Sequence, residues 1–254
     1  GNQTALMFVY YLITRWKELG KINGKEYIVK TIVTTETIKT IAERNGVEMY
    51  DVYTGFKWIA NVMRENEGKK NYIGGGEESY GFLCEDFVRD KDAVSACVIL
   101  AEIAAWAKDQ GLSLYQLLQK IYVEYGFSKE KGISVVKKGK SGAEEIEAMM
   151  KKFRENPLTE IAGSKVTYFY DYSTLKGKDY AENETVTLDM PTTSNVLQYF
   201  TEDNTKVSIR PSGTEPKIKF YCEVHSKVKS IDELPEAEKA AEEKINQIKA
   251  SLGI

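Results

Sequence analysis

The residues best suited to chemistry lie near the end of the chain, in the stretch KVSIRPSGTEPKIKFY at residues 206–221. Two runs of alternating apolar and polar residues flank a short polar block, a pattern typical of a β-hairpin. An ordinary hairpin turn requires only Asn-Gly or Asp-Gly, whereas this tip carries an arginine, two hydroxyl side chains and a glycine. A guanidinium can bind two phosphate oxygens at once, and hydroxyl and backbone N–H groups add further donors. The tip therefore predicts an anion site.

The expected donors at this tip are Arg210, Ser212, Gly213 and Thr214. We expect Gly213 to adopt a backbone conformation closed to other residues, which would let neighbouring N–H groups converge on the anion. Lys217 and Lys219 raise the local positive potential, and Glu215 offsets part of it. The alternative is a hairpin turn whose charges are incidental.

A second candidate site is GGGEESYGF at residues 74–82. We expect its three glycines to form a turn after a strand and to present two adjacent carboxylates and a serine. The stretch matches neither the GxxxxGK[ST] phosphate loop nor the GxGxxG dinucleotide turn. Carboxylates on such a turn, Glu77 first among them, suit paired hydrogen bonds to the vicinal hydroxyls of a sugar. A metal-binding pair and a helix N-cap with acidic first-turn residues are the alternatives.

Two further stretches could line the same crevice. In DVYTGFKWI, Thr54 and Gly55 stand between a predicted strand and a predicted helix. Loops at the carboxyl ends of strands line the ligand crevice of an open α/β sheet, so this loop and the glycine turn could share one rim. In VRDKDAV, Lys91 stands where the strongest predicted helix begins. A plain turn and a solvated charge are the respective alternatives.

The elements that must position these residues change character along the chain. The first half alternates strand patterns, at 27–34 and 47–53, with helix patterns at 36–46, 56–66, 91–111 and 113–126. This alternation predicts an α/β sandwich domain. The expected bounds of this domain are residues 1–125.

Short strands dominate the second half, which we expect to form a domain over residues 126–254. The predicted strands lie at 165–172, 185–190, 195–201, 206–209 and 217–224, with helices at 143–154 and 233–253. Residues 174–184 are expected to form a polar loop. Strands grouped together between helices predict an α+β domain with an antiparallel sheet flanked by helices.

Composition excludes several classes of protein. A net charge of −3 argues against a nucleic-acid binder, and no apolar run approaches the length of a membrane span. The three cysteines, Cys84, Cys97 and Cys222, are widely spaced without a CxxC pair, which favours a reducing cytoplasm over a disulfide framework or a zinc site. His225 is the single histidine, and we expect a structural or surface role for it instead of Ser-His-Asp hydrolysis.

In their order along the chain, these four stretches resemble the α-D-phosphohexomutase family, the phosphoglucomutases and phosphomannomutases. GEES is similar to the family's sugar-binding loop, and RPSGTEPKIKFY to its C-terminal phosphate-binding loop. TGFKWI resembles its substrate-specificity loop, and RDKD the segment that carries an active-site lysine. The resemblance covers essentially the whole chain, as the third and fourth domains of a four-domain enzyme.

The resemblance implies a role for each matching residue. Glu77 and Ser79 would bind sugar hydroxyls, and Thr54 and Gly55 would contact the sugar. Lys91 would lie close to the reacting hydroxyl and assist proton transfer. The residues implied to hold the phosphate that is not being transferred are Arg210, Ser212, Gly213, Thr214 and Lys219.

The resemblance also implies a reaction, the reversible transfer of phosphate between C1 and C6 of a hexose through a bisphosphorylated intermediate. Such enzymes use Mg²⁺ and a sugar bisphosphate activator, but the family's TASHNP phosphoserine loop and DGDxDR magnesium loop do not occur in this sequence. We therefore expect a longer parent polypeptide whose N-terminal domains carry both loops, and an inactive fragment. Some members end the sugar loop with Ser-Gly-His; here Ser79-Tyr80-Gly81 excludes a histidine base at that place.

Alternative functions remain open from the residues alone. A phosphopentomutase or a sugar-bisphosphate synthase would suit the same TGFKWI loop. A non-catalytic sugar-phosphate-binding module is the alternative from another class. For the phosphohexomutase interpretation, the expected partners are sugar phosphates and the missing N-terminal domains of the same polypeptide, with no nucleic acid and no membrane.

Overall fold

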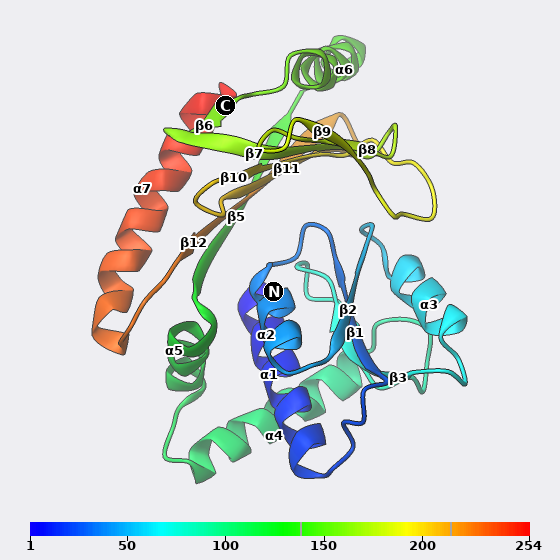
Figure 1. Ribbon diagram of the computed structural model, residues 1–254, viewed down its shortest axis with the longest axis vertical. Helices are drawn as coiled ribbons and strands as arrows, with labels where there is room; N and C mark the ends of the chain where they lie inside the picture. Colours follow the sequence, from blue (N-terminus) through cyan, green and yellow to red (C-terminus); the bar gives the residue numbers. More distant parts are fainter. Residues whose placement is uncertain (138, 214) are drawn as a thin grey trace. The chain divides into compact units, whose positions relative to one another are not determined.

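A computed structural model describes residues 1–137, 139–213 and 215–254 (Figure 1). The chain divides into two units. The first comprises Gly1–Phe127 with Lys227–Leu234, and the second comprises Ser128–Ser226 with Pro235–Ile254. Each unit has its own sheet and its own helices.

The first unit is built on a four-stranded sheet in the order β2-β1-β3-β4. Its strands are β1 (Glu26–Thr31), β2 (Glu48–Val52), β3 (Asn71–Gly76) and β4 (Phe82–Cys84). The central strand β1 runs parallel to both β2 and β3, whereas β4 is antiparallel to β3. The carboxyl ends of the three parallel strands therefore meet at one edge of the sheet.

Helices cover both faces of this sheet (Figure 1). They are α1 (Asn2–Glu18), α2 (Thr37–Arg44), α3 (Phe56–Glu65), α4 (Ala93–Asp109) and α5 (Leu114–Tyr125), and a short 3₁₀ turn, η1, spans Ile231–Glu233. On one face, Phe56 and Ile59 of α3 pack into a core with Val29 of β1. On the other, α1 stacks Phe8 on Phe82 of β4, with ring centroids 4.5 Å apart. The predicted α/β sandwich is confirmed.

Two local predictions in this unit are wrong. Gly74, Gly75 and Gly76 form the end of strand β3 and not a turn. A Cβ on Gly75 would lie 2.2 Å from the carbonyl oxygen of Val29, so the glycines allow neighbouring backbones to approach closely. Lys91 does not begin the long helix, because Asp92 is its N-cap and accepts a 2.7 Å hydrogen bond from the Ser95 N–H.

The second unit contains a sheet in the order β5-β12-β11-β10-β7-β8-β9, with β6 paired to β7. Its strands are β5 (Phe127–Val136), β6 (Glu160–Ile161), β7 (Ser164–Asp171), β8 (Lys176–Asp179), β9 (Glu184–Thr187), β10 (Leu197–Thr201), β11 (Lys206–Pro211) and β12 (Lys217–Ser226). The pairs from β11–β12 through to β8–β9 are antiparallel. This confirms the predicted α+β domain.

Helices α6 (Gly139–Glu155) and α7 (Leu234–Leu252) pack in this unit. The Phe153 ring of α6 packs edge to face against the Phe220 ring of β12. The backbone carbonyl of Phe153 accepts a 2.8 Å hydrogen bond from the Tyr199 hydroxyl. Ile245 and Ile248 of α7 are buried. Among the described residues, no helix combines the length and the apolar character needed to cross a bilayer.

The predicted polar loop at 174–184 is also wrong, because it contains strand β8 and begins β9. These strands are short, polar and near the sheet edge, so they show none of the apolar alternation that reveals a half-buried strand. Gly177 of β8 lies under the ring of Tyr170, where a Cβ would approach the ring to 2.5 Å.

Candidate functional site

The loops that follow β2 and β3 meet at the carboxyl edge of the first sheet. The Gly55 N–H, just after β2, donates a 2.7 Å hydrogen bond to Oε1 of Glu77, just after β3. The Glu77 N–H in turn donates to the Gly81 carbonyl at 2.7 Å, which closes the loop 77–81 on itself. Gly55 has a φ of 111°, a conformation that favours glycine. The predicted specificity loop and sugar loop are thus directly joined.

Lys91 lies against both of these loops. Its Nζ is 5.9 Å from the ring centroid of Phe56, the residue after Gly55, and 3.1 Å from Oδ1 of Asp90. Its stem runs past Gly81, since a Cβ built there would lie 3.0 Å from the lysine Cδ. The hydrogen bond from Lys91 holds the pKa of the Asp90 carboxyl below its usual range. The lysine is therefore a cation placed beside the Glu77 carboxylate loop.

Thr54 and Ser79, the remaining two candidates for contact with a sugar, are both accessible to solvent. Thr54 is half-buried at the end of β2, and Ser79 is exposed at the middle of the loop 77–81. Tyr80 follows with a φ of 71° and is 84% exposed. The loop thus turns sharply outward after its two acids, which leaves Ser79 available to a ligand.

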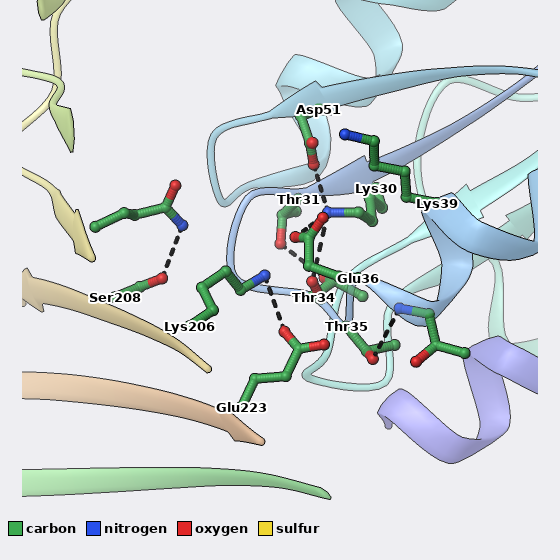
Figure 2. Close-up of polar contacts among 12 residues, drawn as sticks. Lys30, Thr31, Thr34, Thr35, Glu36, Lys39, Asp51, Lys206, Ser208 and Glu223 are labelled. Atoms are coloured by element: carbon green, nitrogen blue, oxygen red, sulfur yellow. Dashed lines mark hydrogen bonds and ion pairs between the residues drawn. The ribbon is translucent and has the colours of Figure 1, made fainter. Parts of the chain in front are cut away.

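A buried lysine at the same sheet edge was not predicted. Lys30 of β1 is 1% exposed, and its Nζ lies 2.6 Å from Oδ1 of Asp51 and 2.9 Å from Oε1 of Glu36 (Figure 2). Asp51 belongs to β2, and Glu36 is the N-cap of α2. The ion pairs tie the end of β2 to the start of α2. The available signal was a lysine inside YIVKTIV, a run that is apolar except for Lys30 and Thr31.

In the second unit, strands β11 and β12 form the predicted hairpin. Arg210 and Lys219 stand directly opposite each other in the register. The Ser212 N–H donates a 2.8 Å hydrogen bond to the Lys217 carbonyl, which joins the two sides of the hairpin at its tip. Opposed residues of an antiparallel pair project from the same face, so the two cations are neighbours.

The cations near the hairpin tip differ in whether a carboxylate is paired with them. Lys217 Nζ pairs with Oε2 of Glu215 at 2.6 Å, and this hydrogen bond lowers the pKa of the Glu215 carboxyl. Within the part of the chain that the structure describes, neither Arg210 nor Lys219 forms an ion pair with a carboxylate. Like charges directly opposite each other destabilise a sheet. A bound anion would remove that repulsion.

The backbone conformation expected for Gly213 is wrong, whereas its part in phosphate binding stays a prediction. Gly213 is exposed with open space around it, and its φ lies outside the left-handed region. Gly213 therefore does not supply an unusual backbone conformation at the tip. Thr214 lies outside the described residues.

A buried polar cluster continues along the same two strands. Lys206 of β11 pairs with Oε2 of Glu223 at 2.9 Å, and His225 Nε2 lies 2.8 Å from Oε1 of the same carboxylate (Figure 2 shows the lysine and the glutamate). Burial favours the neutral imidazole, but the charge of Glu223 outweighs it and raises the pKa of His225. His225 thus has a structural partner, as expected from the sequence.

No group of three or more His, Cys, Asp or Glu side chains comes together as metal ligands among the residues that the structure describes.

Two family models match the chain, one after the other. The description "Phosphoglucomutase/phosphomannomutase, alpha/beta/alpha domain III" matches residues 1–125, and "Phosphoglucomutase/phosphomannomutase, C-terminal domain" matches residues 134–241. The chain belongs to this family. It corresponds to the third and fourth domains of phosphoglucomutase/phosphomannomutase proteins.

Curated relatives agree with this assignment. A phosphoglucomutase of Staphylococcus aureus (strain bovine RF122 / ET3-1) is 38% identical over 221 residues, which are 87% of this chain and 39% of the relative. A phosphoglucomutase of Staphylococcus haemolyticus is 34% identical over 225 residues, 89% of this chain and 40% of the relative. The chain thus spans about two fifths of the length of these relatives.

Solved structures share the fold. The Paramecium phosphoprotein pp63/parafusin, a phosphoglucomutase, superimposes with a TM-score of 0.57 at 17% identity over 97% of this chain and 41% of that chain. A phosphoglucomutase/phosphomannomutase family protein from Burkholderia thailandensis gives 0.56 at 16% identity over 99% and 42%.

Proposed function

We propose that this chain is the sugar- and phosphate-binding half of a longer phosphohexomutase, which interconverts hexose 1-phosphate and hexose 6-phosphate through a bisphosphate intermediate. One observation carries the proposal. The Glu77 carboxylate is held by the Gly55 N–H with Lys91 alongside, in a chain that matches domain III of the family. Carboxylate and ammonium groups on one rim suit a polyhydroxylated ligand.

In this proposal the first unit orients the sugar. Glu77 and Ser79 accept hydrogen bonds from its hydroxyls, and Thr54 and Gly55 contact the ring. Lys91 assists the proton transfer at the reacting hydroxyl, since an ammonium beside a carboxylate loop is in reach of a ligand bound there. A site that hydrogen-bonds hydroxyls discriminates strongly against ligands that lack them.

The second unit holds the phosphate that is not being transferred. Arg210 and Lys219 supply the charge, and the hairpin tip adds Ser212, Gly213 and Thr214. The opposed cations support this role, because an anion relieves their repulsion. Positioning and charge stabilisation carry most of the catalysis in phosphoryl transfer, so a fixed anion clamp suits the reaction.

The phosphorylated nucleophile and the Mg²⁺ site belong, in this proposal, to N-terminal domains of the parent polypeptide. The described residues include no group of three or more His, Cys, Asp or Glu side chains that could hold a metal ion. Mg²⁺ would supply charge neutralisation at the transferring phosphate when bound. A sugar bisphosphate activator and a cytoplasmic location complete the proposal.

Titration of the isotope-labelled chain with sugar phosphates, followed by amide NMR, tests this function. We expect glucose 1-phosphate, glucose 6-phosphate or mannose 6-phosphate at millimolar concentration to shift the amides of residues 54–55, 77–81, 91 and 210–213. Ribose 5-phosphate tests the pentose alternative. Amides that do not move with any of these ligands would contradict the proposal. If the chain binds a sugar phosphate but the full polypeptide does not turn it over, the result would favour a non-catalytic module.

A further inference from the structure

The sugar loop and the lysine that passes it meet at a single glycine. Gly81 ends the loop 77–81 and is buried, and its carbonyl accepts the hydrogen bond that closes that loop. A Cβ at this position would lie 3.0 Å from Cδ and 3.8 Å from Cβ of Lys91, and 3.3 Å from Oε2 of Glu77. A side chain at Gly81 would thus contact both the lysine stem and the Glu77 carboxylate.

The two oxygens of Glu77 have different surroundings. Oε1 accepts the hydrogen bond of the Gly55 N–H. Oε2 is the oxygen on the side of Gly81, and it receives no hydrogen bond from the residues that the structure describes. The carboxylate is therefore fixed through one oxygen and has the other available beside the lysine stem.

The path of Lys91 depends on the room at Gly81. Its stem passes this glycine, and its ammonium then lies 5.9 Å from the centroid of the Phe56 ring. Phe56 follows Gly55 directly, so the lysine reaches from the sugar loop to the specificity loop. A contact of 3.0 Å to a methylene carbon is tighter than most contacts in packed proteins, so a side chain at position 81 requires the lysine stem to shift.

We propose that Gly81 is a positioning residue, whose missing side chain lets Lys91 lie beside Oε2 of Glu77 and reach the turn at Thr54–Phe56. This inference rests on the proposed function, in which both side chains serve the sugar.

The geometry separates this role from one in folding. The φ of Gly81 lies outside the left-handed region, so alanine fits its backbone. The closest atom belongs to a lysine whose side chain is 52% exposed and can move into solvent. A Cβ on Gly76 would instead meet the Gly81 carbonyl oxygen at 2.3 Å, where nothing flexible can yield. Gly81→Ala should therefore leave the fold intact and displace Lys91.

A spectroscopic test needs no sugar. The Phe56 ring should shift the ε-methylene proton signals of Lys91, and Gly81→Ala should reduce that shift by more than half while the Gly55 amide signal persists. Gly132→Ala is the matched control, because its Cβ meets nothing within 4 Å and its φ is also outside the left-handed region. Unchanged lysine signals in a folded Gly81→Ala chain would overturn the inference, whatever the outcome for sugar binding.

A binding cycle tests the consequence for the site. With glucose 1-phosphate as ligand, Gly81→Ala should weaken binding about tenfold in the wild-type background and less than about twofold in a Lys91→Ala background. An equal loss in both backgrounds would mean that Gly81 does not act through Lys91. If the wild-type chain binds no sugar phosphate at all, the proposed function fails, and the lysine signals still decide the positioning role. The thermal midpoints of all variants, followed by circular dichroism, establish that each one is folded.

Discussion

Arg210 is a strong candidate for binding an anionic ligand. It stands opposite Lys219 without a carboxylate partner among the described residues. We predict that Arg210→Ala weakens binding of glucose 1-phosphate about ten- to hundredfold, because hydrogen bonds to charged groups contribute roughly 1.5–3 kcal/mol each. Arg210→Lys should lose less, since a lysine replaces the planar fork by a point charge.

The control for Arg210 is the unliganded chain. Removing one of two opposed cations relieves repulsion, so Arg210→Ala should not lower the thermal midpoint in the absence of ligand. Calorimetry on wild type and both variants measures the binding. Equal affinities for all three would contradict the phosphate clamp.

Glu77 offers a second test at the scale of one residue. We predict that Glu77→Gln weakens sugar-phosphate binding about tenfold and leaves the free energy of unfolding within about 0.5 kcal/mol of wild type. The glutamine carbonyl can still accept the Gly55 N–H, so the link between the two loops survives, but the oxygen offered to the sugar is lost to an amide. Amide NMR titration and urea unfolding measure the two effects. Unfolding that shifts as strongly as binding would favour a purely structural role in the loop.

His225 predicts a pH dependence in the second unit. Burial opposes its protonation, but Glu223 raises the pKa of the folded imidazole above the unfolded value of about 6.5, with Lys206 acting against this and Glu130 for it. A raised folded pKa stabilises the protein below the unfolded pKa, and that stabilisation is lost as the pH rises through the folded pKa. The stability lost in His225→Gln should therefore be larger at pH 6 than at pH 9.

Urea titrations at the two pH values, followed by the NMR signals of β12 amides, measure this difference within the second unit. A difference between wild type and His225→Gln that is constant with pH would mean that folding does not shift the pKa of the imidazole, and a smaller loss at pH 6 than at pH 9 would mean that folding lowers it.

At the scale of elements, strand β3 depends on its glycines. A Cβ on Gly75 would meet the Val29 carbonyl oxygen at 2.2 Å, so the two parallel strands must separate to accept it. We predict that Gly75→Ala destabilises the first unit by about 3 kcal/mol. Gly81→Ala, whose Cβ meets a movable lysine, should cost less than about 1 kcal/mol in the same unit.

Tryptophan fluorescence during urea unfolding suits this comparison. Trp16, Trp58 and Trp106 all lie in the first unit, so the signal reports that unit alone. Equal destabilisation by the two alanines would show that the close strand contact is not the reason for the glycine at position 75.

The elements that the sequence predicted well are those with strong periodicity. Helix α4 and hairpin β11–β12 have long alternating or helical patterns, and both are confirmed. The glycine run in β3 was taken for a turn because glycine favours turns, and only the packing of β1 against it explains its place in a strand. Strand β8 is polar and short, so its pairing with β7 outweighs a local composition typical of loops.

The candidate site could likewise be predicted from the sequence only in part. The order of elements predicted that the loops after two strands share one rim, since loops after parallel strands gather at one edge, and the hydrogen bond between Gly55 and Glu77 confirms that they are neighbours. The hydrogen bond from Gly55 to Glu77 and the contact of Lys91 with Gly81 join residues 22 and 10 positions apart, and no local pattern encodes them. The sequence marks Lys30 as a lysine within a predicted strand, but only the fold brings its ion-pair partners Asp51 and Glu36 to it.

At the scale of the whole molecule, the proposed groups for sugar and for phosphate belong to different units of the chain. The sugar loop and Lys91 lie in the first unit, and the cationic hairpin lies in the second. Phosphoryl transfer also requires a phosphorylated nucleophile and a metal ion to neutralise developing charge. The chain spans about two fifths of its phosphoglucomutase relatives, and we propose that those two components lie in the remainder.

We therefore predict that the purified chain has no mutase activity, with or without Mg²⁺ and glucose 1,6-bisphosphate, although it binds glucose 1-phosphate weakly. Binding should be weak because a ligand enclosed on one side keeps much of its surface in water. Adding the separately produced N-terminal part of the parent should restore partial turnover. Activity should rise with the concentration of either part, since the lost covalent link lowers their effective concentration. A coupled assay at high protein concentration measures the turnover, with the Arg210→Ala chain as the matched control. Turnover by the chain alone that co-purifies with it and disappears in Arg210→Ala would place the nucleophile within these 254 residues and overturn the proposed division.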